Sequence, residues 1–504
     1  MKRTYILLCF IIVKFIIQYS LIGSEYDLQR DEFLHLDQAN HLAWGYLSVP
    51  PVTSWISYLI KLLGNSVFWI KFFPAFFGAL TIYVVWKAIE ELGGNLFALI
   101  FGASCITFSV LFRLNILYQP NSLDVLCWTT LYYFIIKYLN TAQTKYIYCI
   151  AIIFVIGFLN KYNIIFLILG IIPAILLTPE RKELLNIHLY IGFALALILI
   201  TPNLVWQFDN DFPVFHHLQE LSETQLVNVN RWNFIKSQFL FFPGTFPFLI
   251  LGLFSLLRYQ DFKKYRSLFW SFFITIGILL FFRAKDYYAI GIYPIYFAFG
   301  AVYISRLFDN KAGRFIKPAL IIWTIVAFIP VYTIAFPNKS PQYIENHLDK
   351  YRKLGMLTWE DGREHQLPQD FADMQGWKEL AKKVDSIYMK MPSQKNTLVL
   401  CDNYGQAGAI NYYSRKGIKA VSFNADYINW FDLNIKYDHV IRVKNASERN
   451  KELKETAPYF QKSQMSDSIT NRFAREYGTT IFSFINAKID INERIKKEIE
   501  EEKW

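Results

Sequence analysis

Cysteine is scarce in this sequence, and the cysteines that are present follow no functional pattern. The chain has five among 504 residues, with no CxxC pair and no spaced cluster of cysteine and histidine. A structural zinc site and a disulfide framework both need such spacing, so the sequence predicts neither. Internal repeats and low-complexity tracts are also lacking. The cysteines are Cys9, Cys105, Cys127, Cys149 and Cys401.

Charge is scarce as well, at 18% of residues, whereas hydrophobic residues make up 54% and aromatic residues 18%. Long uncharged runs recur through residue 336, and a bilayer core needs about 20 apolar residues per helix. The composition therefore predicts a polytopic α-helical membrane protein, with about 11 transmembrane helices. The candidate spans are Tyr5–Ile22, Val67–Trp86, Leu96–Phe112, Leu123–Leu139, Tyr146–Leu159, Ile164–Leu177, Leu189–Trp206, Phe239–Leu257, Leu268–Phe282, Ala289–Leu307 and Pro318–Phe336.

Lysine and arginine gather in alternate loops, such as residues 258–266 and 306–317. Cytoplasmic loops retain these residues, so the N-terminus is predicted to be cytoplasmic and an odd helix count places the C-terminal part outside. The same distribution explains the net charge of +11 without a nucleic-acid partner. A cleavable signal peptide is the competing interpretation of residues 1–25, but Lys14 interrupts the apolar stretch and no small-x-small cleavage site follows it.

The composition changes after Phe336, where charged residues and prolines replace the apolar runs. We expect a membrane domain over residues 1–336 and a soluble α/β domain over residues 337–504, with strands alternating with helices. The tail from Asn492 reads as a charged helix without an assigned function. The expected strands are Thr397–Cys401, Ala420–Phe423, His439–Val443 and Thr480–Ile485, and the expected helices are Trp377–Met389 and Gln406–Ser414.

Two adjacent carboxylates, Asp31 and Glu32, open a long first outer loop over residues 24–65. Position alone does not separate a site from ordinary loop charges. The same face collects further cations, tyrosines and carboxylates, which favours a site. Such a cluster suits transfer from a lipid-linked phosphate, because lysine and arginine stabilise the phosphate while a carboxylate activates a nucleophile.

Several of these residues have plainer interpretations. Asn203 and Trp206 sit where a helix meets the membrane interface, where tryptophan is common. His35 is in a loop, where most histidines are not ligands. Asp124 lies near the start of an apolar run and is equally consistent with a charge at a helix N-terminus. These four therefore remain possible substrate-binding residues, together with Asp286.

Five segments resemble a known family, the bacterial GT-C glycosyltransferases related to dolichyl-phosphate-mannose protein mannosyltransferases and to the lipid A aminoarabinose transferase. The likeness spans most of the chain, and the combination is more specific than any one piece. The segments are Asp31-Glu32-x2-His35-Leu36-x2-Ala39-x-His41-Leu42-x2-Gly45-Tyr46-x3-Pro50-Pro51; Asn160-Lys161-Tyr162 with Thr201-Pro202-Asn203-x2-Trp206; Lys285-Asp286-Tyr287-Tyr288-Ala289-x-Gly291-x-Tyr293-Pro294; and Asn403-Tyr404-Gly405-Gln406-Ala407-Gly408-Ala409-Ile410.

The resemblance implies a GT-C membrane domain and inverting, metal-independent sugar transfer from a polyprenyl-phosphate donor, with no cofactor. Asp31 would be the catalytic base and Glu32 would position donor or acceptor. One departure is Val49, where the aminoarabinose transferase has a phosphate-binding basic residue before the double proline. The residues that the resemblance assigns to the donor phosphate and lipid are Lys161, Tyr162, Arg283, Lys285, Tyr287 and Tyr288.

The expected partners are membrane lipid, an undecaprenyl-phosphate-linked sugar and an envelope acceptor, on the outer face of a bacterial cytoplasmic membrane. The sequence leaves the acceptor open among a protein hydroxyl, lipid A and a glycan. A transporter or lipid flippase would also be polytopic with charges in its helices, but it would not need a carboxylate pair opening a long outer loop. A glycan polymerase or ligase would share the donor and differ only in its acceptor.

Overall fold

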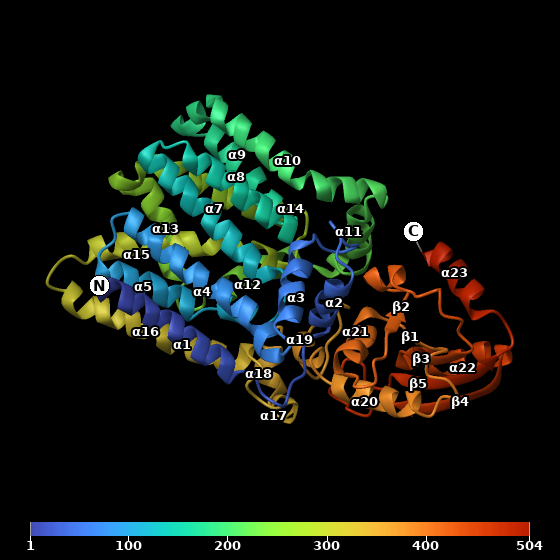
Figure 1. Cartoon of the computed structure of the whole chain (residues 1–504). Coiled ribbons are helices and arrows are strands. Elements are labelled where there is room, and N and C mark those ends of the chain that lie inside the picture. Colours follow the sequence, from blue (N-terminus) through green and yellow to red (C-terminus); the bar gives the residue numbers. More distant parts are fainter. Residues whose placement is uncertain (1, 503–504) are drawn as a thin grey trace.

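Helices form the first two thirds of the chain, and a sheet forms only near the C-terminus (Figure 1). The computed structural model describes residues 2–502. The bundle consists of α1 (Lys2–Ser20), α4 (Val67–Glu91), α5 (Leu96–Thr107), α6 (Leu111–Leu114), α7 (Asn121–Thr141), α8 (Lys145–Asn160), α9 (Ile164–Leu176), α10 (Ile187–Asp209), α11 (Pro213–Thr224), α12 (Arg231–Leu240), α13 (Phe246–Arg258), α14 (Arg266–Phe281), the 3-10 helix η5 (Asp286–Ile292), α15 (Tyr293–Leu307) and α16 (Gly313–Ala335).

Within residues 2–502, six helical segments are long and apolar enough to cross a membrane, and one bent pair would make a seventh. Every apolar run identified in the sequence overlaps a helix, but the count of 11 spans stays a prediction because several of these helices are short. Two runs were wrong as continuous helices. Residues 108–110 interrupt Leu96–Phe112 between α5 and α6. Pro243 and Gly244 interrupt Phe239–Leu257, since proline lacks the N–H that a helix interior requires, and the chain divides there between α12 and α13.

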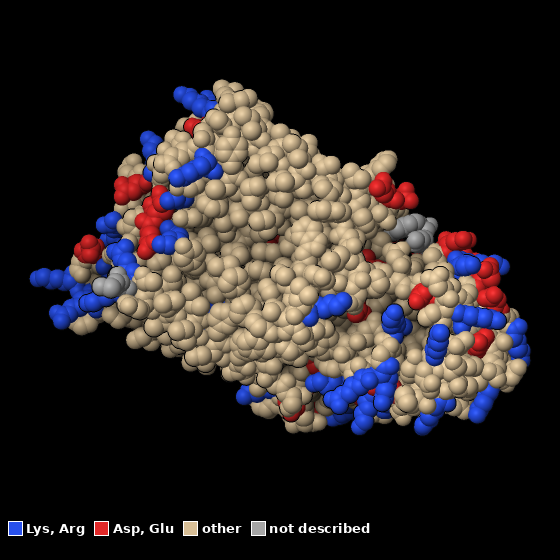
Figure 2. Space-filling model, in the orientation of Figure 1, with Lys and Arg blue, Asp and Glu red and all other residues tan. Residues whose placement is uncertain are grey.

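On the face that Figure 2 shows, charged side chains gather toward the two ends of the molecule, and a region with few charged side chains lies between them. One charged end surrounds the start of α1 and the loops near α5 and α15, and the other is the sheet-containing part (Figure 1). A region of this kind suits a lipid environment, where exposed charges are costly.

The sheet has five strands in the order β2-β1-β3-β5-β4. The strand β1 runs parallel to β2 and β3, whereas β5 is antiparallel to β3 and β4. The sequence located four strands and missed β4, whose polar residues are exposed or half-buried and lack the alternation of a buried strand. The strands are β1 (Thr397–Cys401), β2 (Ala420–Ser422), β3 (His439–Lys444), β4 (Phe460–Ser468) and β5 (Thr480–Ala487).

Helices cover both faces of the sheet, which confirms the predicted α/β layering. Val399 and Cys401 pack toward α20 (Trp377–Tyr388) and α21 (Tyr404–Tyr413), whereas Leu398 packs toward Ile491 and the rest of α23 (Ile491–Glu502). Successive side chains of a strand point to opposite faces, so one strand serves both layers. The remaining helices of this region are α17 (Pro341–Glu345), α18 (Leu348–Arg352), α19 (Gln369–Ala372) and α22 (Arg449–Thr456).

The first outer loop is itself helical and joins the two parts of the molecule. It contains α2 (Arg30–Asp37), the 3-10 helix η1 (Gln38–Asn40) and α3 (Val52–Leu62). Helix α21 of the sheet-containing part packs directly on α2 (Figure 1). The carboxylate pair therefore lies on a short helix held between the bundle and the C-terminal part.

Candidate active site

Asp31 lies in the first turn of α2, where a capping box starts the helix. The Gln29 side chain accepts a hydrogen bond from the Asp31 backbone N–H at 2.8 Å, and Glu32 Oε2 accepts one from the Gln29 N–H at 2.8 Å. These two bonds satisfy N–H groups that a helix start leaves unpaired. A carboxylate in the first turn also lies at the positive end of the helix dipole, where negative charge is stabilised.

The two oxygens of Asp31 are held by neutral donors from distant parts of the chain. Tyr404 donates its hydroxyl hydrogen to Oδ1 at 2.6 Å, and Gln119 donates from Nε2 to Oδ2 at 3.0 Å. The Arg30 guanidinium lies 4.4 Å from the centre of the Tyr404 ring. Within residues 2–502, Asp31 makes no ion pair. We call Arg30, Asp31, Gln119 and Tyr404 the base region.

Glu32 has a different environment from its neighbour. Its side chain is fully buried and pairs with Lys71 Nζ at 2.6 and 2.8 Å. Glu32 Oε1 also accepts a hydrogen bond from the Tyr118 N–H at 2.6 Å. Every contact of this carboxylate is therefore to the protein itself. The geometry favours a role in fixing α2 against α4, and contact between Glu32 and a substrate stays a prediction.

Lys161, Tyr287 and Tyr288 form one cluster. The Lys161 ammonium lies 4.2 Å from the centre of the Tyr288 ring and 5.2 Å from that of Tyr287, and it donates to Asn121 Oδ1 at 2.8 Å. Attraction between an ammonium and aromatic faces holds the cation without neutralising it. The structure thus brings together three of the residues predicted to bind the donor phosphate.

Lys285 belongs to the same cluster and pairs with Glu360 at 2.5 Å. Burial lowers the pKa of Lys285, but the Glu360 carboxylate outweighs that effect and Asp31 acts in the same direction, so the pKa lies above its usual value. Burial, with the charge of Lys285, lowers the pKa of His217 on α11 to about 4, so this histidine is neutral at pH 7. We call Lys161, Lys285, Tyr287, Tyr288 and Glu360 the cation region.

Asp124 lies beneath the cation region in a buried network. Its oxygens accept hydrogen bonds from Trp128 Nε1 and Asn163 Nδ2, both at 3.0 Å. Asn163 also donates to the Tyr288 carbonyl at 3.0 Å. The network therefore supports the backbone of Tyr288, and direct substrate binding by Asp124 stays a prediction.

Asn203 and Trp206 hold the first outer loop in place. Asn203 donates to the Trp44 carbonyl at 2.7 Å and accepts from the Tyr162 hydroxyl at 3.1 Å. The Trp206 ring lies directly against Gly45, where any Cβ would collide with it. These contacts explain why asparagine, tryptophan and glycine are needed at these positions, and they leave a substrate role for Tyr162, Asn203 and Trp206 as a prediction.

The other three predicted residues lie apart from these contacts. His35 is buried, contacts Gln38 Oε1 through Nδ1 at 3.3 Å and has a pKa lowered by burial. Arg283 is exposed and has a left-handed backbone with φ of 52°, and its backbone N–H donates to the Leu280 carbonyl at 3.3 Å. Its side chain makes no hydrogen bond or ion pair to the part of the chain that is described. Asp286 accepts a hydrogen bond from the adjacent Tyr287 N–H at 2.8 Å. A role for these residues is not tested by the geometry.

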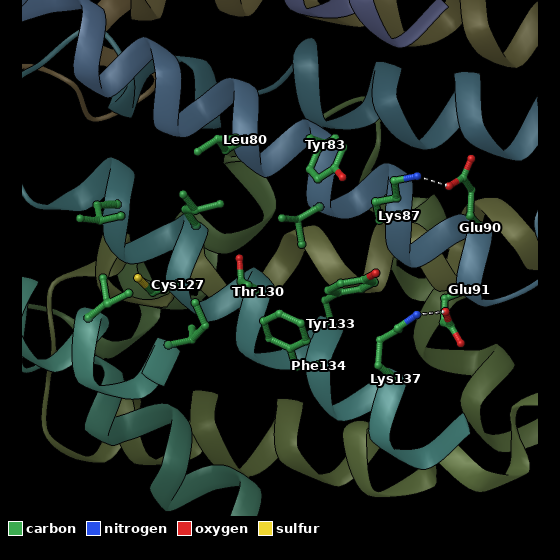
Figure 3. Close-up of a pocket in the computed structure, with 15 residues that line it drawn as sticks. Leu80, Tyr83, Lys87, Glu90, Glu91, Cys127, Thr130, Tyr133, Phe134 and Lys137 are labelled. Carbon is green, nitrogen blue, oxygen red and sulfur yellow. Dashed lines mark hydrogen bonds and ion pairs between the residues drawn. The ribbon is translucent and has the colours of Figure 1, made fainter. Parts of the chain in front are cut away.

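A separate groove of about 710 Å³ lies at the opposite end of the bundle from Asp31. Figure 3 shows its opening between Lys87, which pairs with Glu90, and Lys137, which pairs with Glu91. None of the predicted site residues lines it. Among residues 2–502, no group of three or more histidine, cysteine, aspartate or glutamate side chains could hold a metal ion. Metal independence stays a prediction.

Sequence reasoning missed the partners of the predicted residues. Lys71, Gln119 and Glu360 have no local signal, because each acts on a residue far away in the chain. Tyr404 lies within the motif over residues 403–410, so its position was noted without its contact to Asp31. His217 is one of two adjacent histidines on α11 that no motif singled out.

A family model described as dolichyl-phosphate-mannose-protein mannosyltransferase matches residues 48–206. That match includes Lys161 and Trp206 and begins after Asp31. The lipid A galacturonosyltransferase RgtD of Rhizobium johnstonii is 24% identical over 251 residues, which are 47% of this chain and 52% of that protein. The chain therefore spans about half the length of this curated relative.

Two solved structures share the fold. ArnT from Cupriavidus metallidurans, bound to undecaprenyl phosphate, has a TM-score of 0.62 and 13% identity, covering 94% of this chain and 97% of that one. The oligosaccharyltransferase AglB from Archaeoglobus fulgidus, in complex with an inhibitory peptide and a dolichol-phosphate, has a TM-score of 0.50 and 11% identity, covering 89% and 70%. The family model, the relative and the shared fold confirm that this multi-pass protein is related to the GT-C glycosyltransferases of the protein mannosyltransferase and ArnT group.

Proposed function

We propose that this chain is an inverting glycosyltransferase that moves a sugar from a polyprenyl-phosphate donor to an envelope acceptor. The observation that carries the proposal is that the base region lies close to the cation region. An ionisable carboxylate held by neutral donors lies close enough to Lys285 to influence its pKa, and Lys285 belongs to a cluster of cations and tyrosines. The two regions together can therefore act on the acceptor and on the leaving phosphate in the same reaction.

In this mechanism the acceptor hydroxyl or amine gives its proton to Asp31 while its oxygen or nitrogen attacks the anomeric carbon. The bond between that carbon and the phosphate oxygen breaks, and the polyprenyl phosphate leaves with the electron pair. Lys161 and Lys285 stabilise the negative charge that grows on the phosphate, which is where fixed charges accelerate a reaction most. Attack opposite to the leaving group inverts the anomeric configuration. No metal or other cofactor is required by this scheme.

The proposed location is the outer face of a bacterial cytoplasmic membrane, with eleven spans, a cytoplasmic N-terminus and an extracytoplasmic C-terminal domain. The distribution of lysine and arginine among the loops supports this orientation. The proposed donor is an undecaprenyl-phosphate-linked sugar, which the ligand of the ArnT structure supports. The acceptor is a protein, lipid A or a glycan, and the relationship to a lipid A galacturonosyltransferase supports lipid A as the first to test.

A transporter or lipid flippase is not favoured. The matching family and the relative that shares sequence are both named for glycosyl transfer. The ion pair of Lys71 is buried against Glu32 and fixes a helix, so it offers no free charge to a transported ion. A transferase accounts for the base region and the cation region together.

The test is transfer of radiolabelled sugar from a panel of undecaprenyl-phosphate sugars into cell-envelope fractions by the purified full chain. Asp31→Asn is expected to lower the rate by about 100- to 10,000-fold, the usual contribution of a general base. Asp37→Asn is the matched control on the same helix, and it should transfer at near the wild-type rate at pH 7. Equal transfer by wild type and Asp31→Asn would overturn the mechanism, and the fraction that wild type labels identifies the acceptor class.

A further inference from the structure

The N-terminal turn of α21 reaches from the sheet-containing part into the base region. Tyr404 is the first residue of this helix, and its hydroxyl lies 2.6 Å from Asp31 Oδ1. The Asn403 side chain accepts a hydrogen bond from the Gln406 N–H at 3.1 Å, so it caps the helix that carries Tyr404. The start of the segment Asn403–Ile410 is therefore explained by its structure, because the Asn403 cap fixes the helix turn that places Tyr404 beside Asp31.

Helix α21 approaches α2 closely because Gly408 has no side chain. A Cβ at this position would lie 2.6 Å from the Cβ of Phe33 and 2.6 Å from the Tyr427 hydroxyl. Both distances are too short for a real carbon atom, so any larger residue would push the helices apart. The glycine thus sets the separation that brings the Tyr404 hydroxyl within hydrogen-bond distance of Asp31.

The contacts of Tyr404 determine the direction of its hydrogen bond. Burial, together with the charge of Asp31, raises the pKa of Tyr404 well above its usual value, so the hydroxyl keeps its proton and donates it. The second oxygen of Asp31 receives a hydrogen bond from Gln119. An ionised carboxylate has about four acceptor positions, so two remain for an incoming hydroxyl. Both donors are neutral, so they orient the base without neutralising it.

We propose that Tyr404 is a positioning residue for sugar transfer, through which the C-terminal part holds the catalytic base in its reactive orientation. This inference rests on the proposed function. The Tyr404 hydroxyl fixes the Asp31 carboxylate from one side, and the Arg30 guanidinium holds the Tyr404 ring in place. Access of the acceptor to Asp31 is therefore coupled to the docking of α21 on α2.

Tyr404→Phe tests the proposal, because it removes only the hydroxyl and keeps the ring against Arg30. A hydrogen bond to a charged group is worth enough to change a rate by roughly 10- to 100-fold. We expect kcat to fall by that factor with the donor KM unchanged. The acid limb of the pH–rate profile should move to higher pH, since the ionised base has lost a donor. A role in stability alone would not move this limb.

Tyr412→Phe is the matched control. Tyr412 is on the same helix and donates to the Asn65 carbonyl at 3.1 Å, so its loss weakens the same interface without touching Asp31. Its kcat and pH profile should match those of wild type. Equal losses of kcat in both variants, with an unchanged pH profile, would overturn the proposal in favour of docking alone. Wild-type kcat in Tyr404→Phe would also overturn it.

Incorporation of 3-fluorotyrosine at position 404 gives a second variant that retains the hydroxyl and so does not depend on the folding of Tyr404→Phe. The ring fluorine makes the hydroxyl a stronger donor, so the acid limb should shift to lower pH, opposite to the shift in Tyr404→Phe. An unshifted limb would overturn the proposal. Asp31→Asn in the same assay separates the two claims, because an active Asp31→Asn enzyme would remove the proposed function itself, whereas an inactive one leaves Tyr404 to be judged by its own variants.

Discussion

The base region and the cation region use opposite kinds of contact. Asp31 is held by two neutral donors, Tyr404 and Gln119, and makes no direct ion pair in the described chain. Lys285 is held by a full carboxylate, Glu360, whose side chain is 39% exposed. The base is therefore oriented without being neutralised, whereas the cation already carries an anion that a phosphate must replace.

This difference follows from what each region does in the proposed reaction. A base receives a proton from the acceptor and keeps its neighbours, so fixed donors serve it well. A phosphate-binding lysine must exchange one anionic partner for another, and a partly exposed carboxylate is easier to displace than a buried one. The comparison predicts that substitutions near Asp31 change kcat alone. Substitutions near Lys285 should raise the donor KM and also lower kcat, because the same charge stabilises the leaving phosphate.

The largest effect is expected at the buried ion pair between Glu32 and Lys71, which anchors the helix that carries Asp31. Lys71→Met leaves Glu32 buried without its counter-charge, and breaking a buried pair by removing one partner costs about 3–5 kcal/mol. We expect a strongly lowered Tm in thermal unfolding and loss of transfer. Lys87→Met, which breaks the exposed pair with Glu90, should change the free energy of unfolding by less than about 1 kcal/mol. An unchanged Tm in Lys71→Met would contradict the structural role of Glu32.

The interface between α2 and the C-terminal part should depend on pH. Burial raises the pKa of Asp37 and of Asp426 to about 6. Each carboxyl keeps its proton when docked but loses it near pH 4 when exposed, so docking is strongest at acidic pH and weakens as the pH rises through 6. The change is on the order of 3 kcal/mol per group.

Hydrogen exchange in α21 measured between pH 4.5 and 7.5 checks this dependence. Asp37→Asn should reduce the pH dependence by about half, because Asn cannot ionise, and the double variant with Asp426→Asn should abolish it. Faster exchange at pH 5 than at pH 7, after correction for the intrinsic rate, would show that the sign is wrong.

Removal of either cation should weaken donor binding more moderately. Lys285→Met and Lys161→Met each remove a charge-assisted contact to the donor phosphate, which corresponds to roughly a 10- to 100-fold rise in the donor KM. Lys61→Met is the control, because Lys61 lies in the outer loop and donates to Asn40 instead. A fall in kcat with unchanged KM would mean that these lysines do not bind the ground-state phosphate.

The smallest effect, and the only gain, is expected at Glu360. Glu360→Gln removes the anion that competes with the donor for Lys285, and a partly exposed pair is worth less than about 1 kcal/mol. The donor KM should therefore fall by a few-fold, while Lys285→Met moves it in the opposite direction. A raised KM in Glu360→Gln would indicate that this carboxylate helps to hold the donor.

Much of the fold follows from local patterns. Strands β1, β3 and β5 were located because apolar residues alternate or run continuously, and β4 was missed because its contacts are made by backbone pairing to β5. The Pro243-Gly244 pair marks the break between α12 and α13, because proline lacks the N–H that a helix interior requires. Local sequence reports the propensity of a segment, whereas the backbone pairing that holds a polar edge strand leaves little local trace.

The sequence predicts which residues belong to the candidate site, but it does not predict which partners these residues contact. Asp31 and Glu32 are adjacent carboxylates, and the sequence treated them as a pair, but they point to different partners. A Gln29 cap with Glu32 three residues later is a variant of the capping-box pattern, which could have separated the two. The Tyr404 contact could not be derived, because it depends on how two parts of the chain pack together.

The hydrogen bond between Asp31 and Tyr404 joins residues that are 373 positions apart. Asp31 enters the membrane environment early in synthesis, whereas Tyr404 emerges only after the whole helical bundle. The proposed base thus acquires its reactive orientation only when translation is almost finished and the last domain has folded against the first loop. Incomplete chains would be inserted with a base that is not yet oriented, so premature transfer from the lipid-linked donor would be slow.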